Sequence, residues 1–270
     1  MLGLDTASVD VTITDPPFDD EAHTQGRRIN SAQYSGSEYG DGRQIVYRPL
    51  AFPPLDDAAR ALAACQIARV TKRWMVVFCQ IESAHLWRKD LEDAGAEYIR
   101  TGIWRKPDGQ PQYSGDRPGL GYETMVVCHG KRAKGDRLRW NGGGRSGVFE
   151  GYRYGEADDV PGWFEHTRDQ HAKSLVVDER NGKRTERLAR VAPHQTTKPL
   201  SLMLELVELF SDAGELVCDP FAGSASTGVA ALQLKRGFLG WEISPEHHEM
   251  AQRRLRGDEA RPNPRQPSLF

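Results

Sequence analysis

The chain has 270 residues, of which 38% are hydrophobic, and it carries six Trp and a formal net charge of -2. This length suits one large domain, or one domain with an inserted subdomain, and the apolar content can fill a sizeable core. A charge close to neutral gives no overall signal for nucleic acid, so any basic binding surface has to be local.

The sequence gives no support to the membrane, secretory and metalloprotein classes. No apolar run approaches the length of a membrane span, and the first ten residues, MLGLDTASVD, lack the basic start and apolar stretch of a signal peptide. The four cysteines are widely spaced, which favours reduced core thiols over disulfides or a zinc site: Cys65, Cys79, Cys128 and Cys218. We therefore expect a cytoplasmic protein without a metal site.

The first predicted strand leads into a stiff tetrad. Val9, Val11 and Ile13 alternate with polar residues, which is typical of a strand. The tetrad is Asp15, Pro16, Pro17 and Phe18. Because two adjacent prolines fix two φ angles and remove two backbone donors, one carboxylate and one ring are held in set positions. Taken alone, the tetrad leaves open an ordinary strand-to-loop turn with an exposed Asp.

Helices and strands are predicted to alternate over the next hundred residues. Residues 19–50 are polar and rich in Gly, and they form a long loop of the kind that is usually functional or disordered. Apolar spacing and terminal signals then predict a helix over 55–72, a buried strand over 74–79, a helix from Ser83 to about Ala94, and strands over 97–104 and 122–128.

Residues 129–195 differ in composition and show weak periodicity, which indicates an inserted or appended module. Its basic residues form two clusters: Lys131, Arg132, Lys134, Arg137, Arg139 and Arg145, and then Lys183, Arg184, Arg187 and Arg190. Such charges can neutralise nucleic-acid phosphates. A run of charges is also common on an ordinary solvated surface, and composition alone does not decide between the two.

Regular periodicity resumes at Pro199, where the pattern predicts half of a doubly wound α/β unit. A helix is predicted from Pro199, followed by a strand over 215–219, a small-residue loop over 221–226, a helix over 227–235 and a strand over 237–243. The helix beginning near Thr227 presents free N–H groups to an anionic ligand. Glu242, nineteen positions after Gly223, suits a hold on ribose hydroxyls.

These features predict a nucleoside-containing cofactor. Ala225 stands where a dinucleotide loop needs its middle glycine, which weakens an NAD or FAD interpretation. A nucleoside without pyrophosphate, such as S-adenosylmethionine, needs no such close approach. A plain βαβ turn followed by a surface Glu stays open as an alternative.

The order of three motifs is similar to that of a known family. DPPF, then TTKPL, then DPFAGSASTG resembles the β class of DNA amino-methyltransferases, from about residue 4 to residue 255. The resemblance implies an α/β, Rossmann-like fold, with a seven-stranded, mainly parallel sheet, helices on both faces, one antiparallel edge strand and a circularly permuted order. It implies a catalytic half (1–128), a target-recognition region (129–195), a cofactor half (196–257) and a flexible tail (258–270).

The resemblance also implies roles for particular residues. Asp15 and the carbonyl of Pro16 would accept hydrogen bonds from the exocyclic amine of a flipped base, and Phe18 would stack on that base. Asp at position 15 favours N6 of adenine over N4 of cytosine. The implied S-adenosylmethionine site consists of Asp15, Lys198, Asp219, Phe221, Ala222, Gly223, Ser224, Thr227 and Glu242, with Lys198 near the methionine carboxylate. A solvated Lys is the alternative for Lys198.

Two departures from the family pattern stand out. Ala225 replaces the usual glycine, and only MLGLDTAS precedes the first strand, where relatives carry a further strand with an acid near the cofactor's adenine. Asp5 is the candidate substitute for that acid.

The predicted partner is double-stranded DNA. The residues expected to contact it are Arg27, Arg28, Lys131, Arg132, Lys134, Arg137, Arg139 and Arg145. The chain ends in QPSLF, which resembles peptides that dock on the bacterial replication sliding clamp; Gln266, Leu269 and Phe270 would make that contact, and an unstructured tail is the alternative.

Several readings of function stay open. The leading one is a bacterial or phage adenine methyltransferase, of the kind found in restriction–modification, acting as a monomer or homodimer. The alternatives are a cytosine-N4 enzyme, a catalytically decayed DNA-binding module, a methyltransferase for RNA or protein glutamine, and an NAD oxidoreductase.

Overall fold

The computed structural model describes residues 1, 3–18, 55–106, 118–133, 135–150, 171–177, 184–190 and 197–257, with the backbone alone for 171–177 and 184–190. Some predicted site residues lie outside these ranges: Arg27, Arg28, Lys134, Lys183, Gln266, Leu269 and Phe270. In the part of the chain that is described, no helix has the length and apolar character needed to cross a membrane.

Each predicted helix and strand is present in the structure. The elements are β1 (Val11–Thr14), α3 (Asp57–Val70), β2 (Trp74–Cys79), α4 (Ala84–Asp93), β3 (Glu97–Arg105), β4 (Tyr122–His129), β5 (Val148–Glu150), β6 (His171–Val177), β7 (Arg184–Arg190), α6 (Leu200–Phe210), β8 (Leu216–Asp219), α7 (Ser226–Gln233), β9 (Gly237–Gly240) and α8 (Pro245–Arg256). Of these, the structure adds β5, β6, β7 and α8, which the sequence patterns did not predict. The Asp56 side chain caps α3 by accepting a hydrogen bond from the Ala59 amide at 2.7 Å. Ser83 precedes α4 as predicted, but its hydroxyl bonds the Gln80 carbonyl instead of a helix amide.

The main sheet has seven strands in the order β5-β3-β4-β2-β1-β8-β9. Neighbouring strands are parallel except at β4, which runs antiparallel to both β2 and β3. The predicted seven-stranded, mainly parallel sheet is confirmed. The predicted position of its antiparallel strand at an edge was wrong, because β5 adds outside β3 and both neighbours enclose β4. A separate hairpin pairs β6 with β7.

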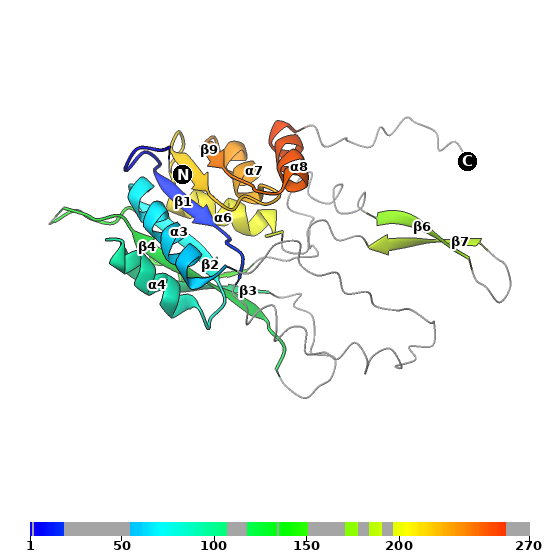
Figure 1. Ribbon diagram of the computed structural model, residues 1–270, viewed down its shortest axis with the longest axis horizontal. Coiled ribbons are helices and arrows are strands. Elements are labelled where there is room, and N and C mark those ends of the chain that lie inside the picture. Colours follow the sequence, from blue (N-terminus) through cyan, green and yellow to red (C-terminus); the bar gives the residue numbers. More distant parts are fainter. Residues whose placement is uncertain are drawn as a thin grey trace.

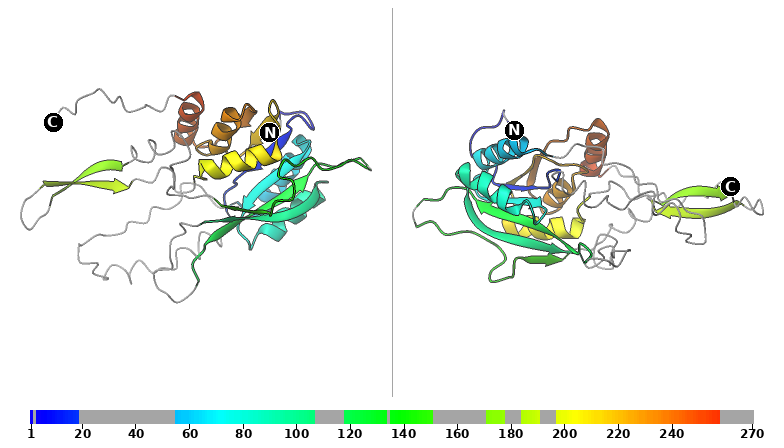
Figure 2. Two further views of the ribbon diagram at one scale, coloured as in Figure 1. Left: turned by 180° about the vertical axis from the view of Figure 1, so that it is seen from behind. Right: turned by 60° about the horizontal axis from the view of Figure 1, so that its bottom comes forward.

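Helices cover both faces of this sheet, α3 and α4 on one and α6 and α7 on the other (Figures 1 and 2). Alternate residues of β2 serve the two layers, so Val76 packs toward α6 and Val77 toward α3 and α4. Because both faces are buried, the whole strand is apolar, which is why the run WMVVFC was readable as a buried strand.

Strand β1 joins the first part of the chain to the last. It pairs in parallel with β2 on one side and with β8 on the other, where Thr12 lies opposite Cys218. The permuted order implied by the three motifs is thus present in the sheet. Since parallel strands align their carboxyl ends, the tetrad after β1 and the loop after β8 lie at the same edge of the sheet.

Residues 135–150 belong to the main body of the protein. Trp140 packs on the core near Phe210, and Phe149 of β5 is 3% exposed. The Asn141 side chain donates to the carbonyls of Glu208 and Ser211 at the end of α6. The predicted recognition region, 129–195, therefore begins with a segment that the structure places on the catalytic sheet.

Candidate active site

Two motifs that are far apart in sequence meet at the carboxyl edge of the sheet. Thr14, the last residue of β1, donates its hydroxyl proton to Asp219 Oδ1 at 2.6 Å, and Asp219 is the last residue of β8. Asp219 Oδ2 accepts from the Thr227 hydroxyl at 2.7 Å, and its Oδ1 also accepts from the Phe221 amide at 3.1 Å. This buried carboxylate therefore connects the tetrad strand, the small-residue loop and the start of α7.

The tetrad carboxylate is held by a lysine from the other half of the chain. Lys198, just before α6, donates from Nζ to Asp15 Oδ2 at 2.5 Å and lies 3.1 Å from Glu123 Oε2. Lys198 is buried, so the solvated alternative was wrong. Its ammonium group contacts two carboxylates of the chain itself, in a place where the sequence predicted contact with the cofactor's methionine end.

Glu123 and Lys106 complete this group, and sequence reasoning missed both. Lys106 Nζ lies 2.5 Å from Glu123 Oε1. Lys106 follows β3 and Glu123 is near the start of β4, so the antiparallel pairing of these strands places both at the carboxyl edge. A sequence signal was present, since a charged residue inside the apolar strand YETMVVC is costly unless it is paired.

Burial and pairing set the charge states here. Burial raises the pKa of Asp15, and the attraction of Lys198 offsets that rise only in part. Burial also favours the neutral form of Glu123, but Lys198 and Lys106 outweigh it and hold the pKa of Glu123 well below its usual range. Burial lowers the pKa of the Lys198 ammonium, and the Asp15 and Glu123 carboxylates reverse this, leaving it raised. Lys198 thus favours the ionised form of Asp15 against the effect of its burial, and Glu123 is held as a carboxylate between two ammonium groups.

The loop after β8 is open above its glycine. Gly223 has φ +52, and nothing lies within 4 Å of the position that a Cβ would occupy on it. Its amide donates to Glu242 Oε2 at 2.9 Å, while Glu242 Oε1 accepts from the Ser244 amide at 2.8 Å. These bonds orient the carboxylate beside the open loop and leave lone pairs for ligand hydroxyls. A small-residue loop with an adjacent carboxylate fits the nucleoside part of a cofactor.

Ile243 adds an apolar group that sequence reasoning did not identify. It follows Glu242 directly and is 96% exposed, the most exposed large hydrophobic residue among those described. An isolated exposed Ile is common on protein surfaces, but this one stands next to a carboxylate fixed by two backbone amides. The position offers an exposed apolar side chain beside the predicted ribose contact.

Ala225 takes the left-handed conformation that favours glycine. It caps α7 with φ 60° and ψ 37° and is fully buried. A left-handed L-residue costs roughly 1–2 kcal/mol, so the loop keeps its shape at an energetic cost. The methyl group is accommodated, and the usual glycine is not required for this backbone path.

We expect Ala225→Gly to raise the free energy of unfolding by about 0.5–1 kcal/mol, because glycine removes the left-handed strain and this gain exceeds the added chain entropy. Urea denaturation at neutral pH measures it. Ala230→Gly, in the right-handed interior of α7, is the matched control and should lower stability by about 1 kcal/mol. Destabilisation by both variants would contradict the strain argument.

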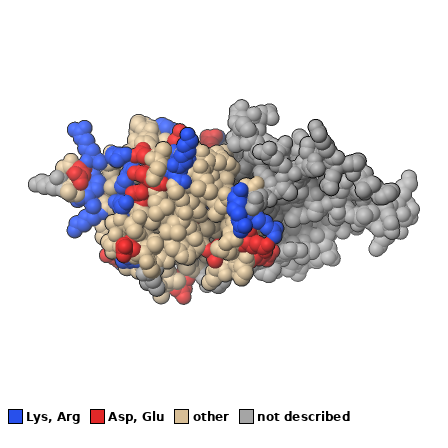
Figure 3. Space-filling model, turned by 90° about the horizontal axis from the view of Figure 1, so that it is seen from above, with Lys and Arg blue, Asp and Glu red and all other residues tan. Residues whose placement is uncertain are grey.

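The described basic residues of this stretch lie toward the opposite end of the sheet from Asp15, and they are Lys131, Arg132, Arg137 and Arg139. Because β4 is antiparallel, its last residue, His129, pairs with Trp74 at the start of β2. Arg132 pairs with Glu97, Arg139 with Asp212, and farther along Arg145 with Glu205. In Figure 3, Lys and Arg with Asp and Glu among them lie at the end away from the grey residues, and a second group of both charges lies beside the grey residues. Lys131 and Arg137 are exposed on the same connection.

Asp5 is likewise placed away from the site. The amide of Ala7, two residues later, bonds the carbonyl of Arg69 near the end of α3, before β1 begins. Asp5 therefore lies toward the amino end of the parallel strands, while Glu242 lies at their carboxyl edge. The position of Asp5 therefore gives no support to the suggestion that it replaces the acid near a cofactor's adenine.

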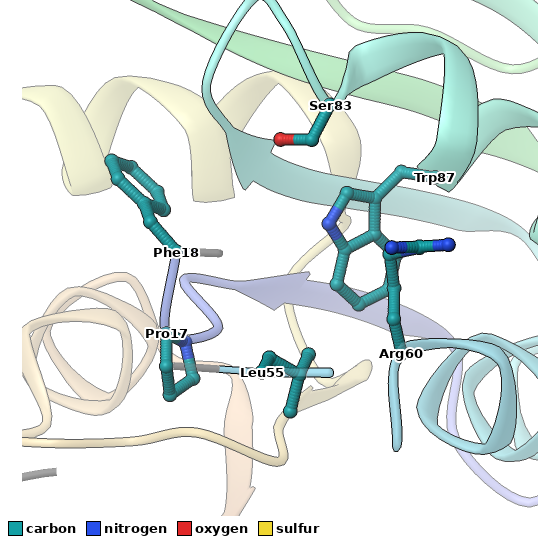
Figure 4. Close-up of a pocket in the computed structure, with 6 residues that line it drawn as sticks. All are labelled: Pro17, Phe18, Leu55, Arg60, Ser83 and Trp87. Atoms are coloured by element: carbon teal, nitrogen blue, oxygen red, sulfur yellow. The ribbon is translucent and has the colours of Figure 1, made fainter. Parts of the chain in front are cut away.

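A small pocket lies beside the tetrad, between the starts of α3 and α4 (Figure 4). Its lining residues are Pro17, Phe18, Leu55, Arg60, Ser83 and Trp87. Arg60 is fixed there by Asp57 and Asp90 at 2.7 and 2.8 Å. The pocket lies between Phe18 and Trp87 of α4, and Arg60 and Ser83 make part of its lining polar.

Comparison with known proteins identifies a family model and relatives that match this chain. The N6/N4 methyltransferase family model, described as DNA methylase, matches residues 9–253. The type II methyltransferase M.HinfI of Haemophilus influenzae is 24% identical over 261 residues, covering 95% of this chain and 65% of that protein. The DNA adenine methyltransferase YhdJ of Escherichia coli is 44% identical over 62 residues, 23% of this chain and 21% of that protein. The chain thus matches less than two thirds of either curated relative.

Solved structures share the fold. The complex of M1.HpyAVI with SAM has 21% sequence identity and a TM-score of 0.55, with 92% of this chain and 89% of that chain covered. The PvuII DNA methyltransferase, described as cytosine-N4-specific, has 12% identity and a TM-score of 0.58, with 95% and 89% covered. At these identities the likeness concerns the fold alone.

Proposed function

The chain belongs to the N6/N4 family of DNA methylases, and from this premise we propose that it transfers a methyl group from S-adenosylmethionine to the exocyclic amine of a base in double-stranded DNA. The observation that carries the proposal is the bond between Thr14 and Asp219, which connects the tetrad to the open small-residue loop. A donor site and an acceptor carboxylate at one edge are what a direct transfer between two bound molecules needs.

The residues that would hold the cofactor fit its parts. Gly223 leaves space above the loop, and Glu242 stands beside it with both oxygens oriented by backbone amides. S-adenosylmethionine, when bound, supplies a methyl group activated by a sulfonium. The residues of the loop would hold that group and the nucleoside in place, and the walls of the site would limit competing attack by water.

Asp15 would act on the base. An exocyclic amine is a weak nucleophile because its lone pair is delocalised into the ring. Asp15 and the Pro16 carbonyl would each accept a hydrogen bond from the amine. The lone pair on nitrogen would then be free to form the new N–C bond. The cofactor would supply the methyl group for this bond by cleavage of its S–C bond, and the electron pair of that bond would stay on sulfur. The surplus proton on nitrogen then passes to Asp15 or to water beside it.

We favour N6 of adenine over N4 of cytosine, because the tetrad begins with Asp and this letter is typical of the adenine enzymes that the sequence resembles. The base would have to leave the duplex to reach Asp15, and Phe18 would stack on it. The segment between Glu150 and Thr197 starts and ends at the carboxyl edge, since β5 pairs with the end of β3 and Lys198 contacts Asp15. We therefore propose that contacts with DNA come from this segment, which includes Arg184, Arg187 and Arg190 of β7, more than from 131–139.

The decisive experiment is methyl transfer from labelled S-adenosylmethionine to unmethylated duplex DNA, followed by nucleoside analysis of the digest. Labelled N6-methyladenine would support the proposal, and N4-methylcytosine would move the target to cytosine. Label on RNA or protein and none on DNA would overturn the substrate. Cofactor binding without transfer to any substrate would favour a decayed DNA-binding module.

Ile243 provides a separate test of the cofactor site. We expect Ile243→Asp to weaken binding of S-adenosylmethionine about tenfold or more, because an apolar contact with the adenine would be lost and a second carboxylate would stand beside Glu242. Isothermal titration calorimetry measures the dissociation constant. Leu62→Asp, at an exposed position on α3, is the matched control and should bind as the wild type does. Equal affinities for all three proteins would place the adenine elsewhere.

A further inference from the structure

Four side chains from four segments form a chain of alternating charge at the carboxyl edge of the sheet. In order they are Lys106, Glu123, Lys198 and Asp15, and successive charged atoms lie 2.5, 3.1 and 2.5 Å apart. The exposed fractions of these side chains are 11%, 13%, 8% and 24% in the same order. Asp15 is the most exposed member of this charge chain, so it is the member that a substrate can reach.

The ammonium group of Lys198 is held on several sides. Besides its two carboxylates, it lies 5.0 Å from the ring centre of Phe78, 5.6 Å from that of Phe18 and 5.8 Å from that of Trp104. Aromatic faces attract cations, and a desolvated ammonium is costly unless it is paired. A lysine side chain normally has many rotamers, but these contacts select one. The position of Nζ is therefore fixed before any substrate arrives.

Fixing Lys198 fixes Asp15. Lys198 engages Oδ2 only, so the carboxylate is oriented while Oδ1 remains for another donor. Glu123 shares the same lysine, and its negative charge limits how strongly Lys198 holds Asp15. Lys106 in turn neutralises Glu123. Within this group the two ammonium groups offset the two carboxylates, which lowers the cost of burying them. The buried Asp219 carboxylate is a further negative group that interacts with Asp15.

We propose that Lys198, Glu123 and Lys106 are positioning residues that orient Asp15 and set its ionisation for the target amine. This inference rests on the proposed function, in which Asp15 accepts hydrogens from that amine. In this proposal Lys198 acts on the carboxylate that receives the target amine, and not on the cofactor. Glu123 and Lys106 act on the same carboxylate through Lys198. It also predicts opposite effects for the two neighbours of Asp15, because one is a cation and the other an anion.

The pH dependence of methyl transfer tests this directly. In Lys198→Met, Asp15 loses its counter-charge, so we expect the acidic limb of kcat/KM to move up by about 1 pH unit or more and the rate at neutral pH to fall about 100-fold. In Glu123→Gln, a like charge is removed, so the limb should move down. Lys198→Arg should keep the limb near its wild-type position with a reduced rate, because charge is retained and geometry is not.

Lys72→Met is the matched control, because Lys72 pairs with Asp10 at 2.8 Å on a surface away from Asp15. It should leave the limb unchanged. Parallel losses of rate in Lys198→Met and Glu123→Gln, with neither limb moved, would mean that these residues only support the fold and would overturn the inference. A faster Lys198→Met enzyme with a lower KM for DNA would also overturn it, since Lys198 would then be occupying the place of the amine.

A measurement that needs no turnover separates this inference from the proposed function. Without Lys198, Asp15 and Glu123 take up protons more readily in the folded state, so the loss of Tm in Lys198→Met should be larger at pH 7.5 than at pH 5. An equal loss of Tm at both pH values would overturn the charge chain even in an active enzyme.

If the wild type methylates no DNA, the proposed function fails, and the Tm comparison still decides whether the charge chain exists. Should Lys198→Met fail to fold, Lys106→Met/Glu123→Gln keeps the charge balance and should be more stable than either single variant.

Discussion

Asp15→Asn is expected to lower kcat for methyl transfer to DNA by about 1,000-fold while leaving the fold intact. Asparagine has the same shape, but it offers one acceptor oxygen and one donor group in place of two acceptors. The amine of the base would lose the acceptor that frees its lone pair, and Lys198 would face a neutral partner. The effect should appear in kcat more than in cofactor affinity, because the interaction belongs to the reacting amine.

Single-turnover transfer of labelled methyl to duplex DNA measures this effect, with cofactor binding checked by calorimetry. Asp93→Asn is the matched control, because Asp93 is an exposed carboxylate paired with Lys89 on the surface of α4. It should retain wild-type rates. If Asp15→Asn kept a tenth or more of the wild-type rate, Asp15 would not be the acceptor, and the chain of charges behind it would need another purpose.

Asp219→Asn is expected to remove a pH dependence of stability. Burial raises the pKa of Asp219 to about 6, although its bonds with Thr14 and Thr227 act in the opposite direction. The folded state therefore holds a proton that the unfolded state releases above its ordinary pKa of about 3.9. Protonation of Asp219 thus favours folding at low pH, and this contribution is lost as pH rises through about 6.

The shift of about two units corresponds to at most roughly 3 kcal/mol. The free energy of unfolding of the variant, relative to the wild type, should rise by that order between pH 4 and pH 7, because asparagine stays neutral throughout. Urea denaturation at intervals of half a pH unit measures this. Asp10→Asn is the control of opposite sign. Burial raises the pKa of Asp10, but the Leu216 amide and Lys72 together lower it by more, so the net pKa is lowered. The stabilisation that Asp10 contributes is therefore lost on acidification. Parallel pH curves for the wild type and Asp219→Asn would show that the buried carboxylate is not titrating.

The ionised form of Asp219 is thus kept at a cost in stability. Its two oxygens receive bonds from β1, from the loop and from α7, so it sets the mutual position of the tetrad and the cofactor loop. A carboxylate that is costly to bury but bonded to three segments is typical of a site that trades stability for geometry.

The elements of the fold were largely readable from local patterns. Strand 74–79 was predicted at its observed bounds, because a strand buried on both faces is apolar at every position. The helix after Pro199 was readable because its buried residues repeat at helical spacing. In contrast, strand β5 is only three residues long and lies in a stretch of weak periodicity, so its pairing with β3 was not predictable.

The sequence by itself determined which chemical groups the site contains. These are the proline-stiffened carboxylate after β1, the small-residue loop after β8 and the acid that follows β9. Their spacing along the chain also determined the family and the kind of sheet. Only the tertiary structure decided which charges meet. Lys198 and Asp15 are 183 positions apart, and nothing local to either residue names its partner. The same holds for Arg132 and Arg139, whose partners Glu97 and Asp212 are brought to them by the antiparallel course of β4. Ion pairs of this kind form between side chains brought together by the packing of whole elements, so they follow from the fold and not from any segment alone.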